Sequence, residues 1–150
     1  MKKIVLLFMS AMALSLAISC NKDNSTDDYK SGIVGTWKID RLFLNDYDSE
    51  GNLIDEYHYV SWEEEDIAQY WIFNDDNTGS FVKTYLFEGD THNESFTYFI
   101  IGNSLIINQE SYQIEKLTKK ELNFSGRGNY SDGGFWEGLY YLMRVNSISD

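Results

Sequence analysis

One short segment of the sequence carries acidic side chains at the spacing of a calcium-binding loop. Asp46, Asp48 and Glu50 occupy alternate positions and Gly51 follows them, which is how an EF-hand loop places its first ligands and its glycine. The twelfth position holds Tyr57 in place of the bidentate glutamate. We therefore favour a hairpin turn here. Asp46, Asp48 and Glu50 are kept only as a weak calcium site, and no other metal site is expected.

The residues that usually perform hydrolysis are scarce. The two histidines, His58 and His92, are 34 positions apart, and neither belongs to an HExxH pattern. No GxSxG sequence marks a nucleophilic serine. We expect no catalytic residues, no cofactor and no enzymatic activity.

The only cysteine, Cys20, ends a segment with the features of a bacterial lipoprotein signal. Two lysines precede an apolar run over residues 4–18, and Leu16-Ala17-Ile18-Ser19-Cys20 resembles a lipobox, the site at which such signals are cut. We expect loss of residues 1–19, lipid on the Cys20 sulfur, and a protein held on the outer membrane that faces the periplasm or is exposed on the cell surface. The alternative is an ordinary secretory signal that leaves Cys20 as an exposed thiol.

Negative charge limits the partners of the domain. Lys and Arg total 12 against 24 Asp and Glu, a net charge of −12. Such a surface repels phosphate backbones, so we expect no nucleic-acid partner, and the lipid alone is expected to contact the membrane. The polar residues 20–31 are predicted to be the lipidated cysteine followed by a flexible tether. Their acids, at Asp23 and at Asp27-Asp28, also resemble the signals of surface-exported lipoproteins.

From Gly32 onward the sequence has the pattern of short strands, because aromatic and β-branched residues recur in runs separated by Asn, Asp and Gly. The short links and the absence of proline favour an all-β, small antiparallel up-and-down barrel of eight or nine strands over a sandwich. This domain covers residues 32–146, and residues 147–150 form a tail. The predicted strands are 34–44, 53–60, 69–74, 79–88, 94–101, 104–109, 111–118, 121–127 and 139–146.

A helical turn is predicted over residues 61–68. Ser61 and Glu64 have the spacing of a capping box. The acids that follow Ser61 would then lie at the positive end of the helix dipole, which explains them without a ligand.

Several segments together resemble the lipocalin-like domains of Bacteroidetes lipoproteins. The similar segments are Ile33-Val34-Gly35-Thr36-Trp37, Phe73-Asn74-Asp75-Asp76-Asn77-Thr78-Gly79-Ser80-Phe81, Gly102-Asn103-Ser104-Leu105-Ile106-Ile107, Tyr112-Gln113-Ile114-Glu115-Lys116-Leu117-Thr118 and the last strand with Arg144. Asn77 departs from the usual glycine, which a left-handed turn tolerates. The resemblance implies a barrel whose mouth can hold an apolar ligand, with no catalytic residues. It also implies that Arg144 packs over the face of Trp37 at one end of the barrel, as a cation–π pair.

Aromatic residues are the remaining candidates for a site, and they either line a cavity or fill the barrel. The candidate ligand-lining residues are Trp37, Phe43, Trp71, Phe73, Phe81, Tyr85, Phe96, Tyr98, Phe124 and Tyr141. The glycine-rich segment 126–138 is a candidate lid, with Tyr130, Phe135 and Trp136, unless it packs back onto the barrel exterior.

These observations predict a membrane-anchored, non-enzymatic protein that binds a small apolar or amphipathic ligand in an aromatic barrel. The alternative is an interaction module with a filled barrel. In that case exposed aromatics such as Trp136 contact another envelope protein or a glycan.

Overall fold

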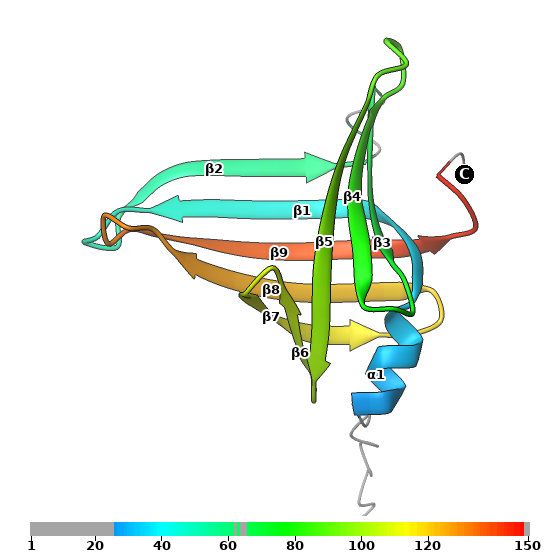
Figure 1. Ribbon diagram of the computed structural model, residues 1–150. Helices are drawn as coiled ribbons and strands as arrows, with labels where there is room; N and C mark the ends of the chain where they lie inside the picture. The colour runs from blue at the N-terminus through cyan, green and yellow to red at the C-terminus, as the bar shows by residue number, and fades with distance from the viewer. Residues whose placement is uncertain (1–25, 62, 64–65, 149–150) are drawn as a thin grey trace, which may run out of the picture.

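The computed structural model describes residues 26–61, 63 and 66–148. They form one short helix and nine strands, whose ends lie within four residues of the predicted ones (Figure 1). The elements are α1 (Thr26–Ile33), β1 (Gly35–Tyr47), β2 (Leu53–Val60), β3 (Ile67–Phe73), β4 (Thr78–Tyr85), β5 (Thr91–Ile101), β6 (Ser104–Ile107), β7 (Glu110–Leu117), β8 (Glu121–Asn129) and β9 (Phe135–Val145).

The strands form a closed antiparallel barrel, which confirms the predicted fold class. From β3 to β9 each strand pairs with the next, and β9 pairs with β1 to close the circle. The two strands β3 and β2 share the other edge of β1: β3 pairs with Gly35–Lys38, and β2 pairs with Arg41–Tyr47. The barrel therefore has eight strands, and β2 is an additional ninth beside the outer half of β1.

This sharing makes the two ends of the barrel different. In Figure 1 the strands β3, β4 and β5 run across the direction of β1, β2 and β9. The helix α1 lies at one end, and the β1–β2 and β8–β9 hairpins lie at the other. We call these the closed end and the mouth.

Aromatic rings fill the half of the barrel near the closed end. Trp71 lies at the centre of this core, with its ring centroid between 5.3 and 6.1 Å from the centroids of five neighbouring rings. Those neighbours are Phe73, Phe81, Phe96, Phe124 and Tyr140. Burying such large apolar surfaces is the main stabilising contribution to a domain of this size.

The alternation of side chains along β1 changes at a bulge. The register with β9 shifts between Ile39 and Arg41, and an extra residue in a strand moves every later side chain to the opposite face. Trp37 and Ile39 are fully buried, but the next inward residue is Leu42. Phe43, which was predicted to line the ligand site with Trp37, therefore lies on the opposite face from Trp37 and Ile39.

Helix α1 begins at Thr26, inside the segment that was predicted to be a flexible tether. Asp27 and Asp28 occupy its first turn and Lys30 its last turn, and this arrangement favours the helix dipole. Ile33 at its end is fully buried. Residues 26–31 are therefore helical, and the signal segment, Cys20 and the first part of the predicted tether lie outside the described residues.

The predicted helical turn over 61–68 is wrong at its end. Ile67 and Ala68 begin β3, and Ser61 donates its backbone N–H to the carbonyl oxygen of Asp40. These residues are part of the strand and not of a helix because Ala68 is buried against Tyr70 and Val82. Trp62, Glu64 and Glu65 lie outside the described residues.

Candidate functional site

The mouth is built from layers of inward-facing side chains on β2, β1, β9 and β8. Strand register decides which residues share a layer, since paired residues on one face are neighbours. The outer layer contains Asp55, Asp46, Trp136 and Gly128; the middle layer contains Tyr57, Leu44, Gly138 and Gly126, joined by Tyr112 of β7; and the floor contains Tyr59, Leu42, Tyr140, Phe124 and Ile114.

Three of these layer positions are glycines, and they make room for aromatic rings. A Cβ atom on Gly126 would lie 2.4 Å from the Tyr112 ring, and one on Gly128 would lie 2.2 Å from the Trp136 indole nitrogen. A Cβ on Gly138 would lie 2.8 Å from the Tyr140 ring. At these three positions the backbone of β8 and β9 is in close contact with the rings of Tyr112, Trp136 and Tyr140.

Above the floor the mouth contains a cavity of about 330 Å³. It is lined by Leu44, Asp46, Asp55, Tyr57, Glu110, Tyr112, Tyr130, Trp136 and Tyr140. A volume of this order is at the lower end of the range for small-molecule pockets, about 300–1,000 Å³. The barrel thus combines a filled half and an open half.

Two of the tyrosine hydroxyls that line the cavity donate hydrogen bonds to carboxylates. The Tyr130 hydroxyl donates to Asp46 Oδ1 at 2.6 Å, and the Tyr112 hydroxyl donates to Glu110 Oε2 at 3.0 Å. The first bond raises the pKa of Tyr130 to about 12. Burial, followed by the charge of Glu110, raises the pKa of Tyr140 to about 12, and burial also raises that of Tyr112. These phenols remain neutral at any physiological pH.

Trp37 and Arg144 lie together at the closed end, far from the mouth. The guanidinium carbon of Arg144 is 4.1 Å from the Trp37 ring centroid. Its two terminal nitrogens donate to the carbonyl oxygens of Val34 and Gly32 at 2.7 and 2.6 Å. Gly35 has a φ of +138°, and a Cβ there would lie 2.3 Å from Arg144 Nη1. Trp37 thus closes the barrel and lines no part of the mouth cavity.

The other nine predicted lining residues fall into three groups. Trp71, Phe73, Phe81, Phe96, Tyr98 and Phe124 lie in the core, and of these Phe124 belongs to the floor of the mouth. Phe43 and Tyr141 lie on the outer face, where their ring centroids are 6.1 Å apart and Arg41 lies 4.6 Å from the Tyr141 ring. Tyr85 lies at the far end of β4, with Lys83 Nζ 5.1 Å from its ring.

Sequence reasoning chose the wrong tyrosine on β9 and missed several mouth residues. Tyr140 faces inward and Tyr141 faces outward, because inward positions on this strand are the even-numbered ones, as for Leu142 and Arg144. The expected Trp37–Arg144 pair could have predicted this. If Arg144 faces inward, the alternation of side chains along a strand places Tyr140 on the same inward face. The other missed residues are Leu44, Asp55, Tyr57, Glu110 and Tyr112.

The candidate lid is a hairpin with a short loop. β8 and β9 pair as far as Asn129 and Phe135, so residues 130–134 alone form the connection. Trp136 turns into the mouth, and Phe135 turns outward and stacks on Tyr47 at 4.7 Å between ring centroids. Tyr130 reaches across the rim to Asp46. The segment therefore forms one side of the mouth.

The acids of the candidate calcium loop have other partners. Asp48 Oδ1 accepts the backbone N–H groups of Glu50 and Asn52 at 2.9 and 2.8 Å. The hydrogen bonds from Asn52 hold the pKa of Asp48 below its usual value. Asp46 belongs to the mouth, and no group of three or more His, Cys, Asp or Glu side chains is arranged to hold a metal ion in the part of the chain that the structure describes.

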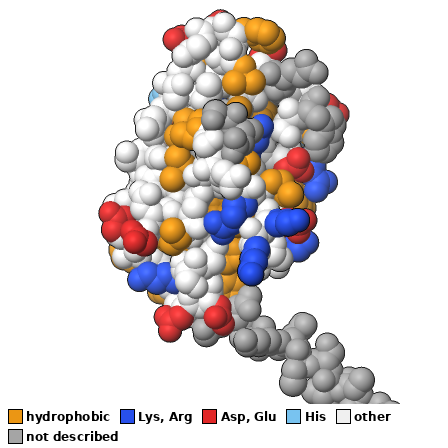
Figure 2. Space-filling view, turned by 90° about the vertical axis from the view of Figure 1, so that its right-hand side faces the viewer, with side chains coloured by type: hydrophobic (Ala, Val, Ile, Leu, Met, Phe, Trp, Pro, Cys, Tyr) orange, Lys and Arg blue, Asp and Glu red, His pale blue; other side chains and the backbone are white. Residues whose placement is uncertain are grey.

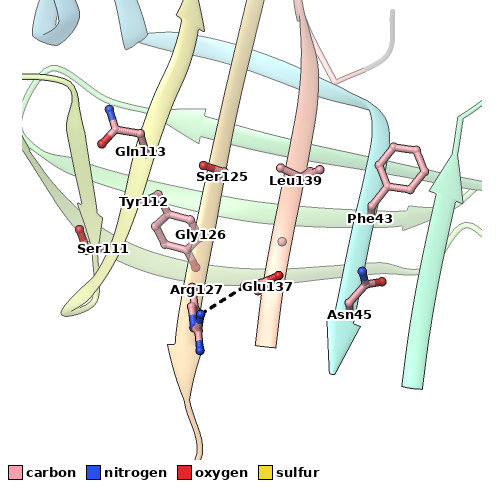
Figure 3. A pocket seen from close by; sticks show the side chains of 11 residues that line it. Phe43, Asn45, Ser111, Tyr112, Gln113, Ser125, Gly126, Arg127, Glu137 and Leu139 are labelled. Atoms are coloured by element: carbon pink, nitrogen blue, oxygen red, sulfur yellow. Dashed lines mark hydrogen bonds and ion pairs between the residues drawn. The ribbon is translucent and has the colours of Figure 1, made fainter. Parts of the chain in front are cut away.

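A second cavity lies on the outer surface of β7, β8, β9 and β1 (Figure 3). Its volume is about 460 Å³, and its lining is mostly polar, with Asn45, Gln113, Ser125 and the ion pair between Arg127 and Glu137 at 3.4 Å. Pockets that hold small molecules are predominantly apolar with a few polar groups. The mouth comes closer to that description, because six of its nine lining residues are aromatic or aliphatic, against three of eleven in the outer groove.

The closed end differs from the mouth in charge. Figure 2 faces this end and shows Lys and Arg side chains over its middle, with Asp and Glu side chains around them. Lys119 and Lys120 lie here, in the turn between β7 and β8. None of the described helices is long and apolar enough to cross a membrane.

Comparison with solved structures finds similar folds at low identity. A deswapped triple mutant of bovine odorant-binding protein is 12% identical, with a TM-score of 0.43 over 77% of this chain and 76% of that one. The S-type phycobiliprotein lyase of Guillardia theta is 9% identical, with a TM-score of 0.45 over 82% and 94%. Lobster apocrustacyanin A1 is 10% identical, with a TM-score of 0.42 over 80% and 64%. TM-scores of this size carry no inference about function.

Sequence comparison is more decisive. No curated protein matches the chain, but the lipocalin-like domain family matches residues 33–124. That match covers more than half of the chain. It includes Trp37 on the first strand, all of the strands from β1 to β7, and the start of β8. The chain therefore belongs to the family of lipocalin-like domains.

Proposed function

We propose that this protein is a non-enzymatic binding protein that holds a small apolar or amphipathic ligand in its mouth. The observation that carries the proposal is the cavity of about 330 Å³ above a floor of fully or nearly fully buried side chains. Tyr59 and Phe124 in that floor are at most 1% exposed. A ligand there gains apolar contact from below and keeps its polar end at the rim.

Binding of the neutral fluorescent probe N-phenyl-1-naphthylamine tests this proposal. Leu44 lines the cavity, so Leu44→Trp fills it and should lower the probe affinity at least about tenfold. Leu139→Trp is the matched control, because Leu139 is 45% exposed and borders the outer groove. It should leave the affinity unchanged. Loss of binding in Leu139→Trp alone, or no binding to the unmodified protein, would overturn the proposal.

We further propose that lipid on Cys20 holds the domain on the outer membrane with the closed end toward the bilayer. The described chain begins at the closed end, where Thr26 Oγ1 accepts the Gly102 N–H at 2.9 Å. The mouth lies at the opposite end of the barrel from α1, so it then points away from the bilayer. Cys20→Ala should move the protein from the membrane to the soluble fraction while its thermal unfolding stays unchanged. Membrane retention of that variant would contradict the anchor.

A second candidate function is contact with another envelope protein or a glycan through the β4–β5 hairpin. Leu86 and Phe87 at its tip are 56% and 80% exposed, and the hairpin projects from the barrel in Figure 1. Exposed apolar side chains of this kind mark interaction sites. Trp136, which was expected to carry such a contact, is part of the mouth cavity instead.

A further inference from the structure

Building on the proposed function, we infer that the mouth selects organic cations, ligands with an ammonium group on an apolar body. The cavity is bordered by five aromatic side chains, three carboxylates and Leu44, and none of the described residues that line it is a lysine or an arginine. The aromatic side chains are Tyr57, Tyr112, Tyr130, Trp136 and Tyr140.

The two carboxylates on the rim are placed as a pair. Asp46 on β1 and Asp55 on β2 are direct register partners, and Trp136 is the partner of Asp46 on the other side. Like charges directly opposite on neighbouring strands repel one another. The ion pairs of the described residues lie elsewhere, at Arg41–Asp40, Lys116–Glu121, Arg127–Glu137 and the two histidines. A cation held between Asp46 and Asp55 would relieve their repulsion.

Each carboxylate has one oxygen engaged by a hydrogen bond from within the protein. Asp46 Oδ1 accepts the Tyr130 hydroxyl at 2.6 Å, Glu110 Oε2 accepts the Tyr112 hydroxyl at 3.0 Å, and Asp55 Oδ1 accepts a backbone N–H at 2.9 Å. These bonds fix the orientation of the groups. The negative charge of each carboxylate then attracts an ammonium group, including a quaternary one that has no N–H to donate.

The aromatic rings supply the other half of cation recognition. Tyr112 lies 5.9 Å from both Trp136 and Tyr140, measured between ring centroids, and its angles to them are 41° and 81°. All three rings line the cavity, and an aromatic ring attracts a cation that lies over its face. A metal ion would gain little from such walls, because metal ions require several oxygen ligands around one point.

Calorimetric titration with three ligands of equal chain length tests the inference. Decyltrimethylammonium, decanol and decanoate are added separately to the protein, the two ionic ligands below their micelle concentrations and decanol below its solubility limit. The cation should bind at least about tenfold more tightly than the alcohol or the carboxylate. This preference should weaken as salt is added, because salt screens the carboxylates.

A triple substitution separates charge from shape. Asp46→Asn, Asp55→Asn and Glu110→Gln together should remove the preference for the cation and keep the affinity for decanol. The control substitutions Asp75→Asn, Glu88→Gln and Asp90→Asn remove the same charge from exposed turns outside the mouth, and they should keep the preference. If the triple variant does not fold, Asp55→Asn alone, at an exposed position on β2, should still reduce the preference.

The outcomes distinguish this inference from the proposed function. Equal binding of decanol and the cation, or a preference that survives the triple substitution, would overturn the cation selectivity and leave the binding function intact. Preference for decanoate would also overturn it. Absence of binding for all three ligands would overturn both.

Discussion

Tyr140 shows how one side chain connects the core to the mouth. Its ring stacks on Phe124 with centroids 4.6 Å apart, and it contributes to both the floor and the cavity lining. The stack belongs to the buried core, and the neighbouring Glu110 adds negative potential from the rim. Tyr140 therefore experiences burial and charge together.

The raised pKa of Tyr140 predicts that stability falls at high pH. Its pKa is raised from 10.0 to about 12 in the folded protein. In the unfolded chain the phenol ionises near pH 10, whereas folding keeps it neutral until about pH 12. The unfolding free energy should therefore fall as the pH rises through this window. Urea denaturation at a series of pH values measures it.

Replacing the phenol provides the control for that measurement. Tyr140→Phe removes the titrating group and keeps the ring, so the fall in stability between pH 10 and about 12 should become shallower. An unchanged slope in Tyr140→Phe would contradict the assignment.

At the scale of elements, the β8–β9 hairpin determines the shape of the mouth. Its paired glycines, Gly126 and Gly138, leave a gap in the wall that the rings of Tyr112, Tyr140 and Trp136 occupy. Any side chain on this pair displaces a ring. The absence of side chains at these two positions thus lets the three rings line the mouth.

Gly138→Ala should both destabilise the protein and weaken ligand binding. The new Cβ would lie 2.8 Å from Tyr140 and 2.9 Å from Leu44, and overpacking of this kind costs about 1–3 kcal/mol. Thermal unfolding and probe titration measure the two effects. Leu139→Ala, on the opposite face of the same strand, should change the probe affinity little. A Gly138→Ala variant with unaltered stability and affinity would show that the rings are not held against this wall.

The strands of this barrel were predictable because their signals are local. Turn residues separate each aromatic run, and Asn77 and Gly102 take the left-handed φ values of 66° and 60° that such turns need. Which side chains of each strand face into the barrel was less predictable. A bulge after Ile39 moved Phe43 to the outer face, and no local sequence feature marks a bulge.

The mouth residues were harder to predict than the core. Asp55 and Glu110 are exposed and polar, so each by itself has the pattern of an ordinary surface position. The register of β2 with β1 brings Asp55 to the mouth, and Glu110 reaches it as the first residue of β7. Both then line the same cavity as Tyr112. Helix α1 was missed for a related reason, since Ile33, its buried anchor, lies at the end of an otherwise polar segment.

For the whole molecule, the two ends of the barrel differ in structure. The closed end joins Trp37, Arg144 and α1 in one hydrogen-bonded cap, because Trp37 Nε1 donates to the Ile33 carbonyl oxygen at 2.7 Å. The mouth contains the cavity, which is lined by carboxylates and aromatic side chains. A membrane anchor at the first end and a ligand at the second would not interfere with each other.

The indole N–H signals of the tryptophans provide the most direct test of the binding site. In a ¹H–¹⁵N NMR titration with decyltrimethylammonium, the signal of Trp136 in the mouth should shift progressively, and that of Trp37 in the cap should stay in place. Single Trp→Phe variants assign the two signals. A shift of Trp136 with a static Trp37 is the predicted result. Saturating ligand that leaves Trp136 unmoved, or that moves Trp37 instead, would contradict binding in the mouth.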